Sequence, residues 1–101
     1  MEFDDLIEPL GEGLKQALRD VVTDATDPEL TKFTLAVAAR SIDIAKMPDG
    51  PDKDELLEEH KGTFDVIAEE HRINLAEKAN AQLTAALDVG LAIVTRLAAS
   101  A

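Results

Sequence analysis

The sequence predicts an all-α fold in which two shorter helices precede one long helix, arranged as a helical hairpin or small bundle. Three observations support this class. Apolar residues make up 46% of the 101 residues, but only 3% are aromatic and much of the remainder is alanine, which suits packed helices better than strands. Apolar positions recur at intervals of three and four. Two short segments containing proline and aspartate divide the chain, which is expected to form a single domain over residues 1–101.

The first helix is expected over residues 3–25, because the apolar residues of this segment fall on one stripe of a helical surface. The stripe consists of Phe3, Leu6, Ile7, Leu10, Leu14, Leu18, Val21, Val22 and Ala25. Pro9, Gly11 and Gly13 are unfavourable inside a helix. The regular part of this helix is therefore expected to begin near Pro9.

The second helix is expected over residues 28–46 and is followed by a loop at 47–52. Asp27, Pro28 and Glu29 supply an N-cap, a proline at the first helical position and an acid in the first turn. In the loop "MPDGPDKDE", Asp52 and Glu55 have the spacing of a capping box. Because the loop is short, the second helix should run antiparallel to the start of the third.

The third helix is expected over residues 53–99, a segment without proline. Unbroken, it would be roughly 70 Å long at ~1.5 Å per residue. Gly62 could end one helix and Thr63 could cap the next, so a break at Gly62 is left open. Written in elevens, the segment reads LLEEHKGTFDV, IAEEHRINLAE, KANAQLTAALD and VGLAIVTRLAA. An eleven-residue register of about 3.67 residues per turn is coiled-coil-like and favours straight or slightly right-handed packing.

This register predicts a helix-packing and oligomer interface. Its stripe comprises Leu57, His60, Phe64, Ala68, His71, Leu75, Ala79, Gln82, Ala86, Gly90, Ile93 and Leu97. Between residues 79 and 101 only Asp88 and Arg96 are charged, and apolar residues occur on every side of the helix. A helix of this kind is buried on more than one side. We therefore expect the first two helices, a partner chain or both to cover it, with a homodimer favoured.

The tetrapeptides "EEHK" and "EEHR" place two histidines, His60 and His71, on this stripe. A di-metal bundle of the ferritin-like type would place Glu three residues before each His, but Leu57 and Ala68 stand there. On one helix the two histidines would lie ~16 Å apart, so they could share a metal only with a partner chain. The favoured interpretation is that they form polar layers in a helical seam. No metal or other cofactor is predicted.

Composition excludes several classes of function. There is no Cys or Tyr, and neither Ser41 nor Ser100 lies in a Gly-x-Ser-x-Gly context, so nothing predicts an enzyme. The net charge of -11, without a cluster of Lys and Arg, argues against direct nucleic-acid binding. The acidic start does not resemble a signal peptide, and Asp88 interrupts the most apolar segment. We therefore expect a cytoplasmic protein, or one exported without a cleaved signal, and no membrane span.

The leading hypothesis is a non-enzymatic, self-associating structural or protein–protein interaction module. One alternative is an acidic, DNA-mimic-like inhibitor or chaperone that binds a basic partner protein. A second is a metal-binding protein that uses His60 and His71 at an oligomer interface. Alanine-rich, acidic, Cys-free composition is also typical of phage and prophage products. In size, acidity and mid-chain turn the chain resembles the small secreted Trp-x-Gly helical-hairpin proteins, although it has no Trp and "MPDGPD" stands at the turn.

Overall fold

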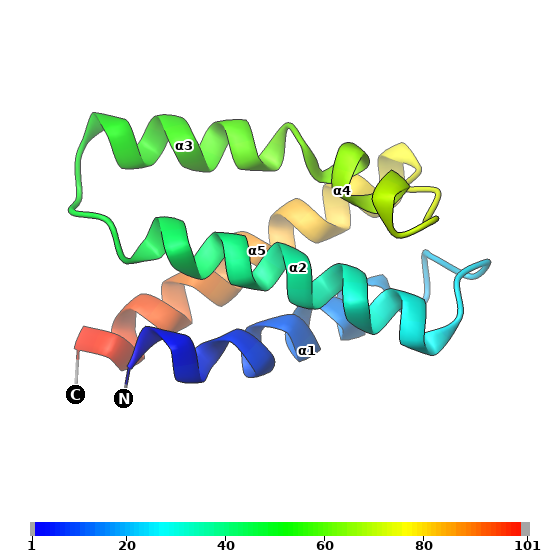
Figure 1. Cartoon of the computed structure of the whole chain (residues 1–101), viewed down its shortest axis with the longest axis horizontal. Helices are drawn as coiled ribbons and strands as arrows, with labels where there is room; N and C mark the ends of the chain where they lie inside the picture. The colour runs from blue at the N-terminus through cyan, green and yellow to red at the C-terminus, as the bar shows by residue number, and fades with distance from the viewer. Residues whose placement is uncertain (1, 100–101) are drawn as a thin grey trace.

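All regular structure in residues 2–99, the part that this computed structural model describes, is helical (Figure 1). The all-α class is therefore confirmed. A short 3-10 helix, η1, precedes five α-helices. Their bounds are η1 Phe3–Leu6, α1 Ile7–Leu18, α2 Asp27–Ala45, α3 Pro51–Lys61, α4 Phe64–Glu70 and α5 Glu77–Ala99.

The helices form a bundle that closes its own core. α2 runs antiparallel to α1, and α3 returns along the other side of α2, as the short loop predicts (Figure 1). α5 crosses α2 obliquely and runs back along α1, so that it ends beside the start of η1 (Figure 1). Phe33, Val37, Leu14 and Leu83 lie in the centre, each 1% exposed or less. The radius of gyration of 13.0 Å is that of a compact domain of about 100 residues.

The first helix is shorter than expected, because α1 ends at Leu18 and not at residue 25. Residues 19–26 contain two Asp, two Val and two Thr, all of which favour non-helical conformations over helix interiors. Val22 is nevertheless buried in the core, so the apolar stripe continues after the helix stops. Pro9 does not delay the helix, which begins at Ile7, because the first-turn amides have no partner within the helix.

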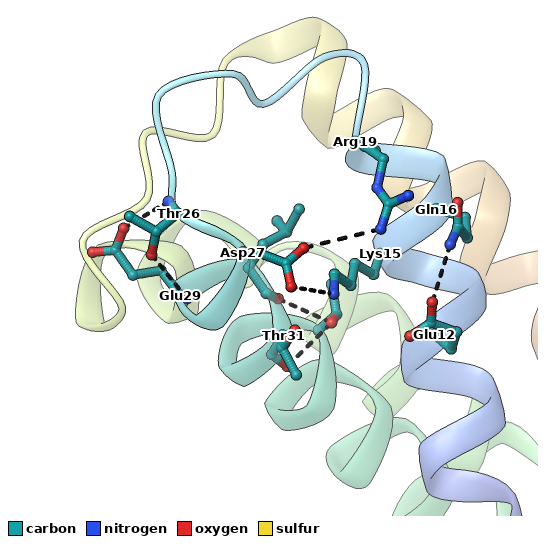
Figure 2. A network of polar contacts seen from close by, with 10 residues as sticks. Glu12, Lys15, Gln16, Arg19, Thr26, Asp27, Glu29 and Thr31 are labelled. Carbon is teal, nitrogen blue, oxygen red and sulfur yellow. Dashed lines mark hydrogen bonds and ion pairs between the residues drawn. The ribbon is translucent and has the colours of Figure 1, made fainter.

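A capping box fixes the start of α2, with Thr26 and not Asp27 as the N-cap (Figure 2). The Glu29 amide donates to the Thr26 hydroxyl at 3.3 Å, and the Thr26 amide donates to the Glu29 carboxylate at 2.8 Å. Hydrogen bonds from Thr26 to the Glu29 carboxylate, the one from its amide first and then one from its side chain, lower the pKa of Glu29. Asp27 instead forms an ion pair with Lys15 of α1, with 2.9 Å between Nζ and Oδ2, and this contact links the two helices (Figure 2).

The single long helix expected over residues 53–99 is wrong, since α3, α4 and α5 occupy this segment. The first break falls at Gly62, the position where one was considered. Thr63 does not cap α4 through its side chain; its hydroxyl donates to the His60 carbonyl at 2.9 Å and closes α3.

The second break, at residues 71–76, was not expected. Arg72 adopts a left-handed conformation with φ 60°. The Ile73 amide donates to the Ala68 carbonyl at 2.8 Å, and the Arg72 amide donates to the Glu69 carbonyl at 3.0 Å. This is the Schellman pattern of a helix C-terminus, with arginine where glycine is usual. The break allows α5 to fold back over α1, so the longest dimension is 38 Å, about half the length of an unbroken helix.

Candidate functional site

The twelve residues predicted for the interface do not form one face. Seven of them, from residue 57 to residue 79, lie on α3, on α4, in the connection to α5 and at the start of α5. None of these seven is exposed: they are Leu57, His60, Phe64, Ala68, His71, Leu75 and Ala79. His60, Phe64 and Ala68 are fully buried, so they pack helices within one chain and are not available to another.

The remaining five residues lie on α5, which buries a neighbouring row; Gln82, Ile93 and Leu97 are exposed, and Ala86 and Gly90 are half-buried. Leu83, Leu87 and Val94 enter the core, at 0%, 0% and 4% exposure. Each follows directly after a predicted interface residue, and successive residues of a helix point about 100° apart. The predicted row therefore points about 100° away from the buried row. The five predicted residues that therefore face away from the centre of the core are Gln82, Ala86, Gly90, Ile93 and Leu97.

These five residues line an open apolar groove between α1 and α5, with a volume of about 470 Å³. We call it the α1–α5 groove. Its α1 wall is Leu6, Pro9, Leu10, Gly13 and Leu14, and Ala85, Val89 and Val94 complete the α5 wall. None of the lining residues carries a charge, and Gln82 is the one with a polar side chain.

The outer edge of the groove exposes large apolar side chains at four-residue intervals. Val89 is 63% exposed, Ile93 51% and Leu97 41%. α5 is also the one helix in the described part of the chain that is long and apolar enough to cross a membrane, and 17% of its most apolar window is buried. A core helix of a soluble protein is mostly buried, so the exposed apolar surface of α5 calls for an explanation.

Two glycines set the shape of the groove. At Gly90, where α5 crosses α1, an added Cβ would lie 2.5 Å from Leu10 Cδ1, so glycine permits this close approach. At Gly13, on the opposite wall, an added Cβ would meet nothing within 4 Å. A side chain at position 90 would therefore displace Leu10, whereas Gly13 keeps space open in the α1 wall.

No charged residue lines the groove. α5 carries two acids and two bases, Glu77, Lys78, Asp88 and Arg96, so its net charge is zero in a chain of net charge -11. Eight of the exposed acids lie on α3 and α4, across α2 from α1 (Figure 1). They are Asp52, Asp54, Glu55, Glu58, Glu59, Asp65, Glu69 and Glu70. The groove lining is thus uncharged, although Asp4, Asp5, Glu8 and Glu12 are exposed on η1 and α1 beside it.

The two histidines take different environments inside the chain. His60 is fully buried, its Nε2 lies 2.8 Å from Ser41 Oγ, and its ring packs edge-on against Phe64. His71 is half-buried with its ring centroid 6.3 Å from that of Phe33. Residues 2–99 contain no group of three or more His, Asp or Glu side chains that could hold a metal ion. Because His60 is fully buried, a partner chain could not reach it, which argues against a metal site shared between two copies.

Sequence reasoning missed the α1 wall of the groove and the role of Ser41. Pro9 and Gly13 did stand out as unfavourable helix residues, which was a signal that this surface has a special shape. Ser41 gave none, because it meets His60 nineteen residues away only after α3 has folded back on α2.

Comparison with protein-family models, curated proteins and solved structures finds no match to this chain. Its function is therefore inferred from the geometry alone.

Proposed function

We propose that this protein is a non-enzymatic interaction module that self-associates through the α1–α5 groove, with a second copy of the same chain as the occupant. The observation that carries the proposal is the uncharged groove edged by Val89, Ile93 and Leu97, each more than 40% exposed. Exposed apolar patches on soluble proteins mark interaction sites.

The surface is self-complementary. Val89, Ile93 and Leu97 form a ridge along one i±4 row of α5. Beside this ridge lies the open space of the groove, which the small residues Ala86 and Gly13 border, while Leu10 covers Gly90. Ridges of one helix pack into furrows of another, and a two-fold axis brings the same patch of both copies together. The ridge of one copy can therefore pack into the groove of the second copy, and the reverse.

Electrostatics favours a second copy at this surface. Two chains of net charge -11 repel each other, and the repulsion is smallest where the least charge is brought together. α5 has no net charge and the groove lining has none at all. Docking through α5 leaves the acidic α3 and α4 of both copies facing solvent. Because the chain closes its own core, the separated monomer should remain folded.

A lipid bilayer would also accept an apolar helix, but the packing of α5 opposes insertion. Leu83 and Leu87 are fully buried against the other helices, and Asp88 forms an ion pair of 2.7 Å with Lys61 of α3. Crossing a membrane would require α5 to leave this core and to carry Asp88 into hydrocarbon, which is costly.

Light scattering coupled to gel filtration tests the proposal with a matched pair of variants. Ile93→Glu places a charge on the ridge, and Val66→Glu places one on α4, at a residue of nearly equal exposure, 51% against 52%. One chain has a mass of 10.9 kDa. We expect wild type and Val66→Glu to elute at twice that mass at micromolar concentration, and Ile93→Glu to elute as a folded monomer.

Three results would count against it. A wild-type protein that stays monomeric up to hundreds of micromolar would refute self-association. Equal dissociation by both variants would show that the groove is not the interface. Flotation of the wild type, but not of Ile93→Glu, with vesicles of phosphatidylcholine and phosphatidylglycerol would assign the groove to lipid instead.

A further inference from the structure

α3 is attached to the bundle mainly through polar contacts. In α3, all of which the structure describes, His60 is the one buried residue. Leu57 is half-buried, and two polar contacts add to the attachment: an ion pair between Lys61 and Asp88 of α5 and a hydrogen bond of 3.2 Å from the Lys53 ammonium to the Ala45 carbonyl of α2. A helix with so little buried apolar surface is among the first parts of a fold to open.

The hydrogen bonds around His60 indicate which tautomer its neutral ring adopts. The Ser41 hydroxyl donates its proton to the Val37 carbonyl at 2.6 Å, so its oxygen can only accept from His60 Nε2, 2.8 Å away. The proton of the neutral ring is therefore on Nε2. Nδ1 has no hydrogen-bond partner and is inaccessible to solvent. Protonation would place an N–H at Nδ1 without an acceptor, which is costly in a buried site.

The charged groups near His60 do not offset this cost. Burial lowers the pKa of His60 below its ordinary value, the positive charge of Arg40 on α2 acts in the same direction, and the Val37 carbonyl opposes both. On α3 itself Glu59 is exposed, and Glu58 lies 3.7 Å from Lys61. On α5, Asp88 is already paired with Lys61, and Phe64 supplies an apolar ring from α4.

We infer that His60 is a pH-sensitive latch: as a neutral ring it holds α3 on α2 through Ser41, and its protonation releases α3 while the rest of the bundle stays folded. In the released helix the imidazolium is hydrated and lies among the carboxylates of α3. The inference stands independently of self-association, because the α1–α5 groove contains no residue of α3.

The direction of the pH effect follows from linkage. Above the ordinary pKa of 6.5 the ring is neutral whether α3 is docked or released, so docking is at full strength. As the pH falls below 6.5, the released state binds a proton that the docked state resists, and docking weakens. One pH unit below 6.5 the opening equilibrium of α3 should rise about tenfold.

Hydrogen exchange measured by NMR on the full chain at pH 7.5 and 5.5 tests this, after correction for intrinsic exchange rates. We expect opening of the α3 amides to increase about tenfold, with little change in α1 and α2. His60→Gln keeps an amide donor toward Ser41 but does not titrate, so its α3 should show no increase. His71→Gln removes the other imidazole and should behave as wild type.

The wild type supplies a second readout that does not depend on a variant folding. The His60 ring resonance should titrate below the ordinary value, in parallel with the opening of α3. Titration at or above 6.5 with α3 still protected would overturn the latch, as would an acid-induced opening that persists in His60→Gln. Equal loss of protection in every helix would also overturn it, because acid would then unfold the whole bundle.

Discussion

Replacing glycine by alanine at positions 13 and 90 tests the packing that shapes the groove. Both residues lie inside helices, so the backbone effect of the change is the same, and alanine stabilises a helix interior by about 1 kcal/mol relative to glycine. At Gly13 the new methyl group meets no atom within 4 Å. Gly13→Ala should therefore raise the free energy of unfolding by about 1 kcal/mol.

At Gly90 the same methyl group would lie 2.5 Å from Leu10 Cδ1. Carbon atoms pack best at about 3.5–4.0 Å, so Leu10 must move by ~1 Å or more, and overpacking of this kind costs about 1–3 kcal/mol. After the gain of about 1 kcal/mol from helix propensity is included, Gly90→Ala should lower the free energy of unfolding by between about zero and 2 kcal/mol. The two variants should thus differ by about 1–3 kcal/mol.

Urea unfolding followed by circular dichroism measures this difference. The chain concentration must lie below the range in which light scattering detects association, because association itself stabilises the folded state. A difference of 1 kcal/mol corresponds to about 4–8 °C in Tm for a chain near this size. If Gly90→Ala gained as much stability as Gly13→Ala, the expected resistance of the packed Leu10 side chain to displacement would be refuted.

Two further substitutions test the parts of the fold that sequence reasoning missed. Arg72→Gly should raise the free energy of unfolding by about 0.5–1 kcal/mol, because relief of the left-handed conformation outweighs the entropic cost of glycine. Arg72→Ala, which keeps Cβ, should show no such gain. Equal effects in the two variants would count against the Schellman end of α4. Leu83→Ala should lower the free energy of unfolding by about 2–5 kcal/mol, whereas Gln82→Ala should leave it within about 0.5 kcal/mol of wild type, as measured by thermal or urea unfolding. The reverse order would mean that α5 presents the other face to the core.

Local signals succeeded where a few adjacent residues settle the conformation. α2 begins and ends within one residue of the expected bounds, because a Thr-x-x-Glu capping box and Pro28 mark its start and the proline-rich loop follows its end. The Gly62 break also had a visible signal. The break at Arg72 had none, since neither glycine nor proline is present and the left-handed arginine is stabilised by Ile73 packing into the core.

The candidate site could be predicted only in part, for a reason that lies in helical periodicity. In a helix that is apolar on every side, the row of Gln82, Ala86 and Ile93 and the row of Leu83, Leu87 and Val94 satisfy the same three-and-four spacing. They lie about 100° apart, and nothing within α5 chooses between them.

The sequence by itself determined the helical class, the capped start of α2 and the accumulation of apolar surface on the C-terminal segment, because these depend on composition and on neighbours a few residues apart. Only the tertiary structure decided which row of α5 enters the core, which row lines the α1–α5 groove and which histidine is sealed against Ser41. Those outcomes depend on how α1 and α2 pack against α5 and α3. Contacts between residues far apart in the chain produce no local periodic pattern in the sequence from which they could be predicted.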